Sequence, residues 1–196
     1  MKTKIVITAF LAITLMFSCK KDKKEDTEVM ETEAVETPAA SKPTPDAKKV
    51  KVNLTSKSGS KVTGNAVFTE DNGSVKMVIV LGGLDQGTHA IHLHETADCT
   101  AEDATSSGGH WNPTGQPHGK WGDASGYHKG DIGNVVADEN GHATKNFTTD
   151  EWCIGCGDAT KDILGKAIIV HQGEDDFKSQ PSGNAGARVS CGGVIE

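Results

Sequence analysis

Histidines at metal-ligand spacing are the residues of this sequence best suited to chemistry. His92 and His94 are two positions apart, so in a β-strand both side chains leave the same face. Imidazole suits copper and zinc, and a strand fixes the ligand directions before a metal arrives. His171 follows the apolar stretch 168–170 and is well placed to join the pair. We therefore expect a metal site built on His92, His94 and His171.

A second group of potential ligands lies in, or directly after, a stretch rich in Gly and Pro. It comprises three histidines and one aspartate: His110, His118, His128 and Asp131. Such a set fills all four positions of a tetrahedral zinc, which is typical of a structural site because a catalytic zinc keeps one position open. We expect a zinc ion that pins this stretch.

The elements that must position these ligands are short strands separated by turns. We expect strands at 50–55, 61–69, 74–81, 88–94, 132–137, 142–148, 167–171 and 188–195. Asn72-Gly73 lies between alternating apolar residues, which is a strong hairpin signal. Eight short strands predict an all-β fold, an antiparallel barrel or sandwich. Two longer connections, 95–130 and 172–186, hold or adjoin most of the histidines, so we expect them to be functional loops.

The first residues have the pattern of an export signal. Residues 1–18 carry Lys2 and Lys4, then an apolar run, then Ser18 before Cys19. This predicts a signal peptide, which is too short to span a membrane. The segment 15–19 resembles a bacterial lipoprotein box, in which the Cys is acylated; the alternative is an ordinary signal peptide cut nearby. We expect a bacterial envelope protein, attached to a membrane through lipidated Cys19 and facing the periplasm or the outer membrane.

Residues 19–49 are rich in Lys, Glu, Thr, Ala and Pro and contain almost no large apolar side chain. Such a composition cannot bury enough surface to fold, so we expect a disordered tether ahead of one domain at 50–196. From Lys51 onward the chain has 11 Lys and Arg residues against 19 Asp and Glu residues, a net charge of −8. This balance argues against nucleic acid as a partner.

The cysteines also favour an exported protein. If Cys19 is lipidated, four cysteines remain, and outside the cytoplasm four cysteines suggest two disulfides. Three pairings are open. The short spacing between Cys153 and Cys156 favours a structural local link, which leaves Cys99 with Cys191; a redox-active pair or half of a zinc site are the other interpretations of Cys153 and Cys156.

Several motifs, in order, resemble the copper/zinc superoxide dismutase family, in its bacterial exported lipoprotein form. They are His92-Leu93-His94, Gly109-His110-Trp111-Asn112-Pro113, His118-Gly119, His128-Lys129-Gly130-Asp131-Ile132-Gly133-Asn134 and the stretch 183–192 with Arg188 and Cys191. The resemblance runs from about Val50 to Glu196 and implies an eight-stranded Greek-key β-barrel. Trp111 stands where many members have Phe, and the family does not generally require the Cys153 to Cys156 motif.

The resemblance also implies roles for individual residues. It implies copper bound by His92, His94, His110 and His171, and zinc bound by His110, His118, His128 and Asp131, with His110 bridging the two metals. It implies that Asp175 links a copper ligand to a zinc ligand, although Glu174 and Asp176 adjoin it. Arg188 would orient the superoxide anion, and Cys99 would pair with Cys191. The compact loop after His171 leaves Lys178 as the one obvious additional cation near the site.

The function implied by the resemblance is superoxide dismutation. Copper would cycle between Cu(II) and Cu(I), two superoxide anions would become oxygen and hydrogen peroxide, and His110 would release copper on reduction and take up a proton. The alternative is a catalytically weak envelope protein that binds or delivers copper and zinc and would need the ligands without Arg188. A homodimer is compatible with this family, whose bacterial members differ in their dimer surfaces.

Overall fold

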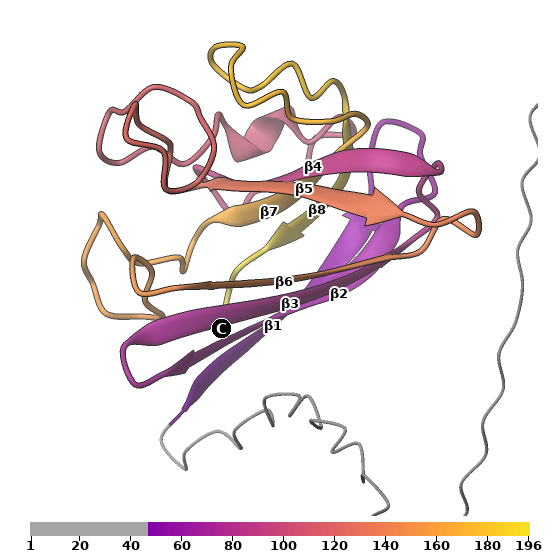
Figure 1. Cartoon of the computed structure of the whole chain (residues 1–196). Helices are drawn as coiled ribbons and strands as arrows, with labels where there is room; N and C mark the ends of the chain where they lie inside the picture. Colours follow the sequence, from indigo (N-terminus) through magenta and orange to yellow (C-terminus); the bar gives the residue numbers. More distant parts are fainter. Residues whose placement is uncertain (1–46) are drawn as a thin grey trace, which may run out of the picture. The chain divides into compact units, whose positions relative to one another are not determined.

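The computed structural model describes residues 47–196, so the predicted signal peptide, Cys19 and nearly all of the predicted tether lie outside the described residues. Eight strands are present (Figure 1): β1 (Lys48–Ser56), β2 (Thr63–Asp71), β3 (Ser74–Gly82), β4 (Gly87–His94), β5 (Asp131–Ala137), β6 (Ala143–Thr149), β7 (Ala167–His171) and β8 (Arg188–Gly193). The only helix in this part of the chain is one 3-10 turn, Thr105–Ser107. No helix among residues 47–196 is long and apolar enough to cross a membrane.

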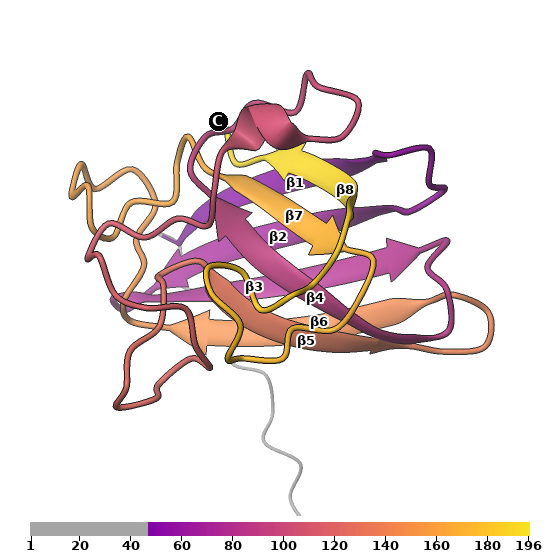
Figure 2. The same ribbon diagram turned by 90° about the horizontal axis from the view of Figure 1, so that it is seen from above.

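The strands form one antiparallel sheet in the order β5-β4-β7-β8-β1-β2-β3-β6. The sheet curls so that its two end strands, β5 and β6, lie next to each other, as the view from above shows (Figure 2). Lys145 Nζ of β6 donates to the carbonyl oxygen of Asn134 on β5 at 2.8 Å across this seam. The predicted eight-stranded Greek-key barrel is therefore confirmed.

Alternating burial along the segments and the turns between them explain why these segments form strands. In β1 the buried residues Val50, Val52 and Leu54 alternate with exposed ones, so one face of the strand points inward. The predicted hairpin joins β2 to β3, where Asn72 (φ 51°) and Gly73 (φ 77°) both adopt the positive φ values that a tight primed turn needs. Burial of one face of each such strand fixes the strand register.

Three long connections leave the barrel, one more than predicted. The first is the histidine loop, residues 95–130, between β4 and β5, and the second spans residues 172–187 between β7 and β8. The third, residues 150–166, joins β6 to β7 and contains Cys153 and Cys156. β1 also begins at Lys48, two residues before the predicted strand, because Lys48 and Lys49 pair with Glu70 and Thr69 of β2.

Candidate metal centre

Four histidines from neighbouring elements meet on one side of the barrel; we call His92, His94, His110 and His171 the strand cluster. β4 pairs with the neighbouring strand β7, with His92 opposite Ile169 and His94 opposite Ala167. His171 is the last residue of β7, and its Nε2 lies 3.4 Å from Nε2 of His94. His110 comes from the histidine loop and forms an isolated bridge with His94. All four are buried, and each offers a nitrogen within 4.8 Å of the others. The fold thus assembles the predicted set.

Hydrogen bonds in the strand cluster decide which nitrogen each ring presents. The Nδ1 atoms of His94 and His171 face the carbonyl oxygens of Gly108 and Gly186 at 3.0 and 3.3 Å. A carbonyl oxygen can only accept, so each Nδ1 carries the proton and each Nε2 keeps its lone pair. These two Nε2 atoms lie 3.4 Å apart. Two lone pairs at this distance suit a shared metal ion, since neither atom can donate to the other.

The second predicted set meets around one carboxylate; we call His110, His118, His128 and Asp131 the loop cluster. Asp131 is the first residue of β5 and is fully buried. The Nδ1 atoms of His110, His118 and His128 lie 3.0, 3.0 and 3.3 Å from its oxygens. Backbone N–H groups of Gly119 and His128 also donate to Asp131 Oδ2, at 3.2 and 2.8 Å. The carboxylate therefore organises the loop as well as offering a ligand atom.

Asp175 connects the two clusters. Its Oδ2 lies 3.0 Å from Nε2 of His92, and its Oδ1 lies 2.9 Å from Nε2 of His118. The backbone of Asp175 is held by the side chain of Asn134, through bonds of 2.9 Å in both directions. Asp176 instead accepts hydrogen bonds from Lys178 and Ser179, so the geometry selects Asp175 over its neighbour.

The ring nitrogens that have no hydrogen-bond partner fit two metal ions. Four buried ring nitrogens have no hydrogen-bond partner among the described residues: His92 Nδ1, His110 Nε2, His118 Nδ1 and His128 Nδ1. Buried polar atoms normally have a partner, because an unsatisfied one costs roughly 1–3 kcal/mol. His118 Nδ1 and His128 Nδ1 are near Asp131 but not aligned for a hydrogen bond. In each cluster the potential ligand atoms lie within 4.8 Å of one another, so a cation bound in each cluster would give these nitrogens a partner.

The electrostatics of the two clusters differ. Burial lowers the pKa of His94 and His171 well below its usual value and lowers the pKa of His110 to about 4. Burial also acts on His118, but the close contacts and negative charges of Asp131 and Asp175 outweigh it and raise the pKa of His118 to about 9. At pH 7 the strand cluster is therefore neutral, whereas in the metal-free chain His118 holds a proton that a metal must displace.

The family model of copper/zinc superoxide dismutase (SODC) matches residues 62–195 of this chain. A curated relative, superoxide dismutase (Cu-Zn) 2 of Aquifex aeolicus, is 34% identical over 134 residues, or 67% of this chain and 78% of that protein. The chain belongs to the copper/zinc superoxide dismutase family. Copper and zinc are the metals of this family, in agreement with the two clusters.

Solved structures give the same fold. The crystal structure of a SOD-like protein from Bacillus subtilis has a TM-score of 0.66 and 29% identity, and the match covers 74% of this chain and 97% of that protein. The crystal structure of the clock protein EA4 has a TM-score of 0.65 and 30% identity, with coverage of 80% and 100%. The superoxide dismutase fold thus also occurs in proteins whose names do not describe a dismutase.

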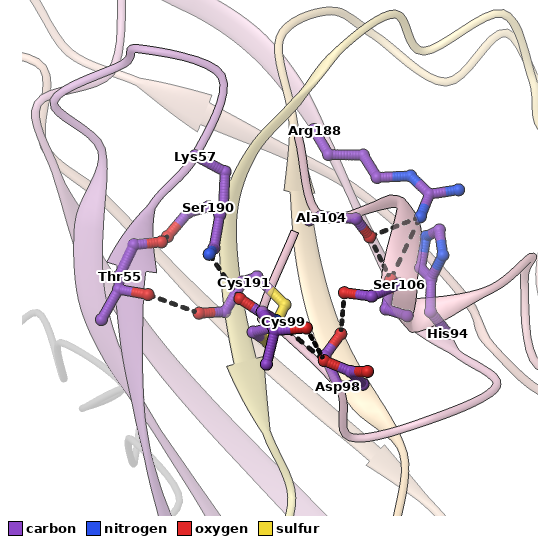
Figure 3. Close-up of a disulfide and its surroundings, with 12 residues drawn as sticks. Thr55, Lys57, His94, Asp98, Cys99, Ala104, Ser106, Arg188, Ser190 and Cys191 are labelled. Carbon is purple, nitrogen blue, oxygen red and sulfur yellow. Dashed lines mark hydrogen bonds between the residues drawn. A yellow bond between two sulfur atoms is a disulfide. The ribbon is translucent and has the colours of Figure 1, made fainter. Parts of the chain in front are cut away.

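Arg188 is the predicted anion-orienting residue, and it lies next to the strand cluster. It opens β8 and pairs with His171 across the β7–β8 ladder. Its Nη1 donates to the carbonyl oxygen of Ala104 at 2.8 Å and to Ser107 Oγ at 3.1 Å, which aims the guanidinium toward the side of His94 (Figure 3). Sequence reasoning found Arg188 but not these two partners, because only the fold brings the 3-10 turn to β8.

The two disulfides pair as predicted from the sequence. Cys99 of the histidine loop is bonded to Cys191 of β8, 92 residues away, and lies close to the Arg188 contacts (Figure 3). Lys57 Nζ donates to the carbonyl oxygen of Cys99, which ties the same loop to the end of β1. Cys153 is bonded to Cys156 within the third connection. The Cys99 to Cys191 disulfide anchors the histidine loop, which contains three of the predicted metal ligands, to strand β8 of the barrel.

Gln180 and Gly183 support the loop cluster, a role that was not predicted from the sequence, although Gly183 begins the family-like stretch 183–192. The side chain of Gln180 accepts from the backbone N–H of His118 and donates to its carbonyl oxygen, both at 2.9 Å. Gly183 has φ +66°, and a Cβ there would lie 1.9 Å from Asp175 Oδ1. Neither residue type by itself indicates such a role, because the role depends on contacts between the 172–187 connection and the histidine loop.

Proposed function

We propose that this protein is a superoxide dismutase that converts two superoxide anions into oxygen and hydrogen peroxide. The observation that carries the proposal is the shared ring of His110. Its Nδ1 is turned to the loop cluster, 3.0 Å from Asp131, while its Nε2 is turned to the strand cluster and has no hydrogen-bond partner. One imidazole with a nitrogen directed at each cluster supports a paired site.

The residues of the two clusters fit different metals. The strand cluster offers four imidazole nitrogens, which suit copper, and the loop cluster offers three imidazoles and one carboxylate, a closed tetrahedral set that suits zinc. We assign copper to His92, His94, His110 and His171, and zinc to His110, His118, His128 and Asp131. Bound copper would supply one-electron chemistry, because copper has two accessible oxidation states. Zinc has only one and therefore does no redox chemistry.

The protein's own residues would guide the substrate and hold the geometry. With a net charge of −8 from Lys51 onward, the domain repels an anion at long range, so a local positive group must draw it in. Arg188 supplies that charge beside His94, while its bonds to Ala104 and Ser107 fix its direction. Asp175 would hold His92 and His118 in place, so that His110 can exchange a proton without movement of the other ligands.

The test is superoxide consumption by the full chain together with its copper and zinc content. Activity with about one copper and one zinc per chain, lost on selective copper removal and restored by copper, is the expected result. Two bound metals with negligible activity would contradict the proposal and would favour an envelope protein that binds or delivers copper and zinc.

We also propose that the protein is exported and lipid-anchored through Cys19 in a bacterial envelope, on the basis of residues 1–19. In a bacterial host, labelled fatty acid should be incorporated into the full chain. The Cys19→Ser variant should carry no label and should leave the membrane fraction. Equal labelling of both chains would overturn the anchor.

A further inference from the structure

Five aromatic rings form a cluster that joins the histidine loop to the barrel and to the third connection. They are Phe68 of β2, Phe147 of β6, Trp121 and Tyr127 of the histidine loop, and Trp152 of the third connection. Trp152 is 1% exposed, and its ring centroid lies 5.0 Å from that of Phe147 and 5.7 Å from that of Trp121. The third connection thus packs against both the barrel and the loop that carries three of the ligands.

Hydrogen bonds join the same connection to the residues on both sides of His128. Trp152 Nε1 donates to the carbonyl oxygen of Lys129 at 2.9 Å, and Tyr127 Oη donates to Glu151 Oε1 at 2.6 Å. Lys129 Nζ forms an ion pair with the other oxygen of Glu151. Two adjacent residues, Glu151 and Trp152, therefore hold the neighbours of one ligand; we call them the brace.

His128 differs from His92 and His118 in how its ring is supported. Metal-binding histidines usually have their second ring nitrogen fixed by a partner, as Asp175 fixes His92 and His118. Among residues 47–196 no hydrogen bond holds Nε2 of His128, and its Nδ1 has no aligned partner either. Apart from packing against the rings of His110 and His118, at centroid distances of 5.6 and 5.5 Å, the direction of this ring therefore depends on the backbone that carries it.

The brace is itself tied to the barrel by the disulfide segment that follows it. Cys153 is bonded to Cys156, and its backbone N–H donates to the carbonyl oxygen of Lys161 at 2.9 Å. The backbone N–H of Ile154 donates to Glu70 Oε2 on β2, also at 2.9 Å. This closed segment makes the brace a fixed support rather than a free loop.

We propose that Glu151 and Trp152 are positioning residues that hold His128 in its ligand direction, so that retention of the zinc ion depends on them. The inference rests on the assignment of zinc to the loop cluster made above. It gives the Cys153 to Cys156 segment, predicted from the sequence only as a structural local link, the specific role of anchoring this support.

The experiment measures the rate at which zinc leaves the copper- and zinc-loaded protein for a chromophoric chelator. Trp152→Phe keeps an aromatic ring and removes the indole N–H, and Tyr127→Phe removes the hydroxyl bound to Glu151. Each should release zinc about fivefold faster, the effect of one lost hydrogen bond, with copper content unchanged. With cobalt(II) in the zinc position, the visible absorption bands of both variants should shift, because the ligand field at His128 changes.

Ile79→Val is the matched control, because Ile79 is fully buried in β3, a strand that pairs with β2 and β6 and carries no predicted ligand. The lost methylene should lower the free energy of unfolding by about 1 kcal/mol. This variant should lower the melting temperature and leave the zinc release rate and the cobalt bands unchanged. Equal zinc release from the unsubstituted chain, Trp152→Phe and Tyr127→Phe would overturn the inference alone. Absence of zinc from the loop cluster of the unsubstituted chain would overturn the zinc assignment as well.

Discussion

The strand cluster and the loop cluster share His110 but are built in different ways. In the strand cluster, His92 and His94 lie on β4 and His171 lies on the neighbouring strand β7, so the barrel itself places three of the four residues. In the loop cluster three of the four ligands lie within residues 95–130, a segment with no strand of its own. A site on strands is positioned by the fold, whereas a site on a loop must be positioned by added contacts.

The added contacts come from β8, from the connection between β7 and β8, and from the first residue of β5. The Cys99 to Cys191 disulfide holds its beginning, Gln180 holds His118, and Asp131 accepts backbone N–H groups from within it. The proton that His118 keeps in the metal-free chain adds a further difference, since the loop cluster must lose it to bind a metal. We expect changes to the supports to affect the loop cluster before the strand cluster.

The largest expected effect comes from removing the long disulfide. Cys99→Ser with Cys191→Ser should lower the free energy of unfolding of the metal-free chain by about 4 kcal/mol, because the link closes a loop of 92 residues. Urea unfolding of the metal-free protein measures this. Cys153→Ser with Cys156→Ser should cost less, since those residues are only three apart. An equal loss in the two double variants would contradict the loop-length argument.

Asp131→Asn tests the separation of the clusters directly. The amide keeps the shape but removes the charge that three histidines share, so zinc affinity should fall by more than about 100-fold, beyond the loss usual for a residue that only supports a ligand. Copper affinity should fall less, and His94→Ala should show the opposite order. Competition titrations with chelators measure both. Equal losses of both metals in each variant would mean that the clusters are one cooperative unit.

Gly130→Ala should damage the contact between the two regions. A Cβ at Gly130 would lie 2.2 Å from the carbonyl oxygen of Leu93, the residue between His92 and His94. Backbone cannot yield as a side chain can, so we expect a loss of about 2 kcal/mol in stability, measured by thermal or urea unfolding. Gly82→Ala is the control, since its nearest neighbour would be His142 at 3.6 Å. A Gly130→Ala chain as stable as this control would contradict the predicted overlap.

Arg188→Ala should have the smallest of these effects and should act on catalysis alone. The side chain of Arg188 makes its hydrogen bonds to Ala104 and Ser107 and to no predicted metal ligand, so metal content should be unchanged. The second-order rate constant for superoxide should fall about tenfold and become less dependent on salt. Stopped-flow measurement at several ionic strengths checks this. Arg188→Lys keeps the charge and should recover part of the rate. An unchanged rate in Arg188→Ala would contradict the proposal that Arg188 guides superoxide to the site.

Much of this molecule could be predicted from the sequence, and the strand cluster most fully. Alternation of buried residues and the Asn72-Gly73 turn identify strands because both signals are local. The ligand residues could be named because their spacing and order carry a family resemblance. Their exact partners could not, since each depends on tertiary contacts.

The supports of the loop cluster show the limit most clearly. Ser107, Gln180 and Trp152 lie in segments without periodicity, and each contacts a residue far away in the sequence. The third long connection was missed for the same reason. A cysteine pair marked it, but nothing local indicates that the residues just before that pair contact Tyr127 and Lys129.

The placement of the tryptophans gives this protein a built-in optical probe of one region. All three belong to the histidine loop or contact it: Trp111 follows His110, Trp121 lies in the aromatic cluster, and Trp152 is bonded to Lys129. Intrinsic fluorescence therefore records the order of that loop, while far-ultraviolet circular dichroism records the barrel. If the loop opens before the barrel melts, the two signals will give separate transitions on the unlabelled chain.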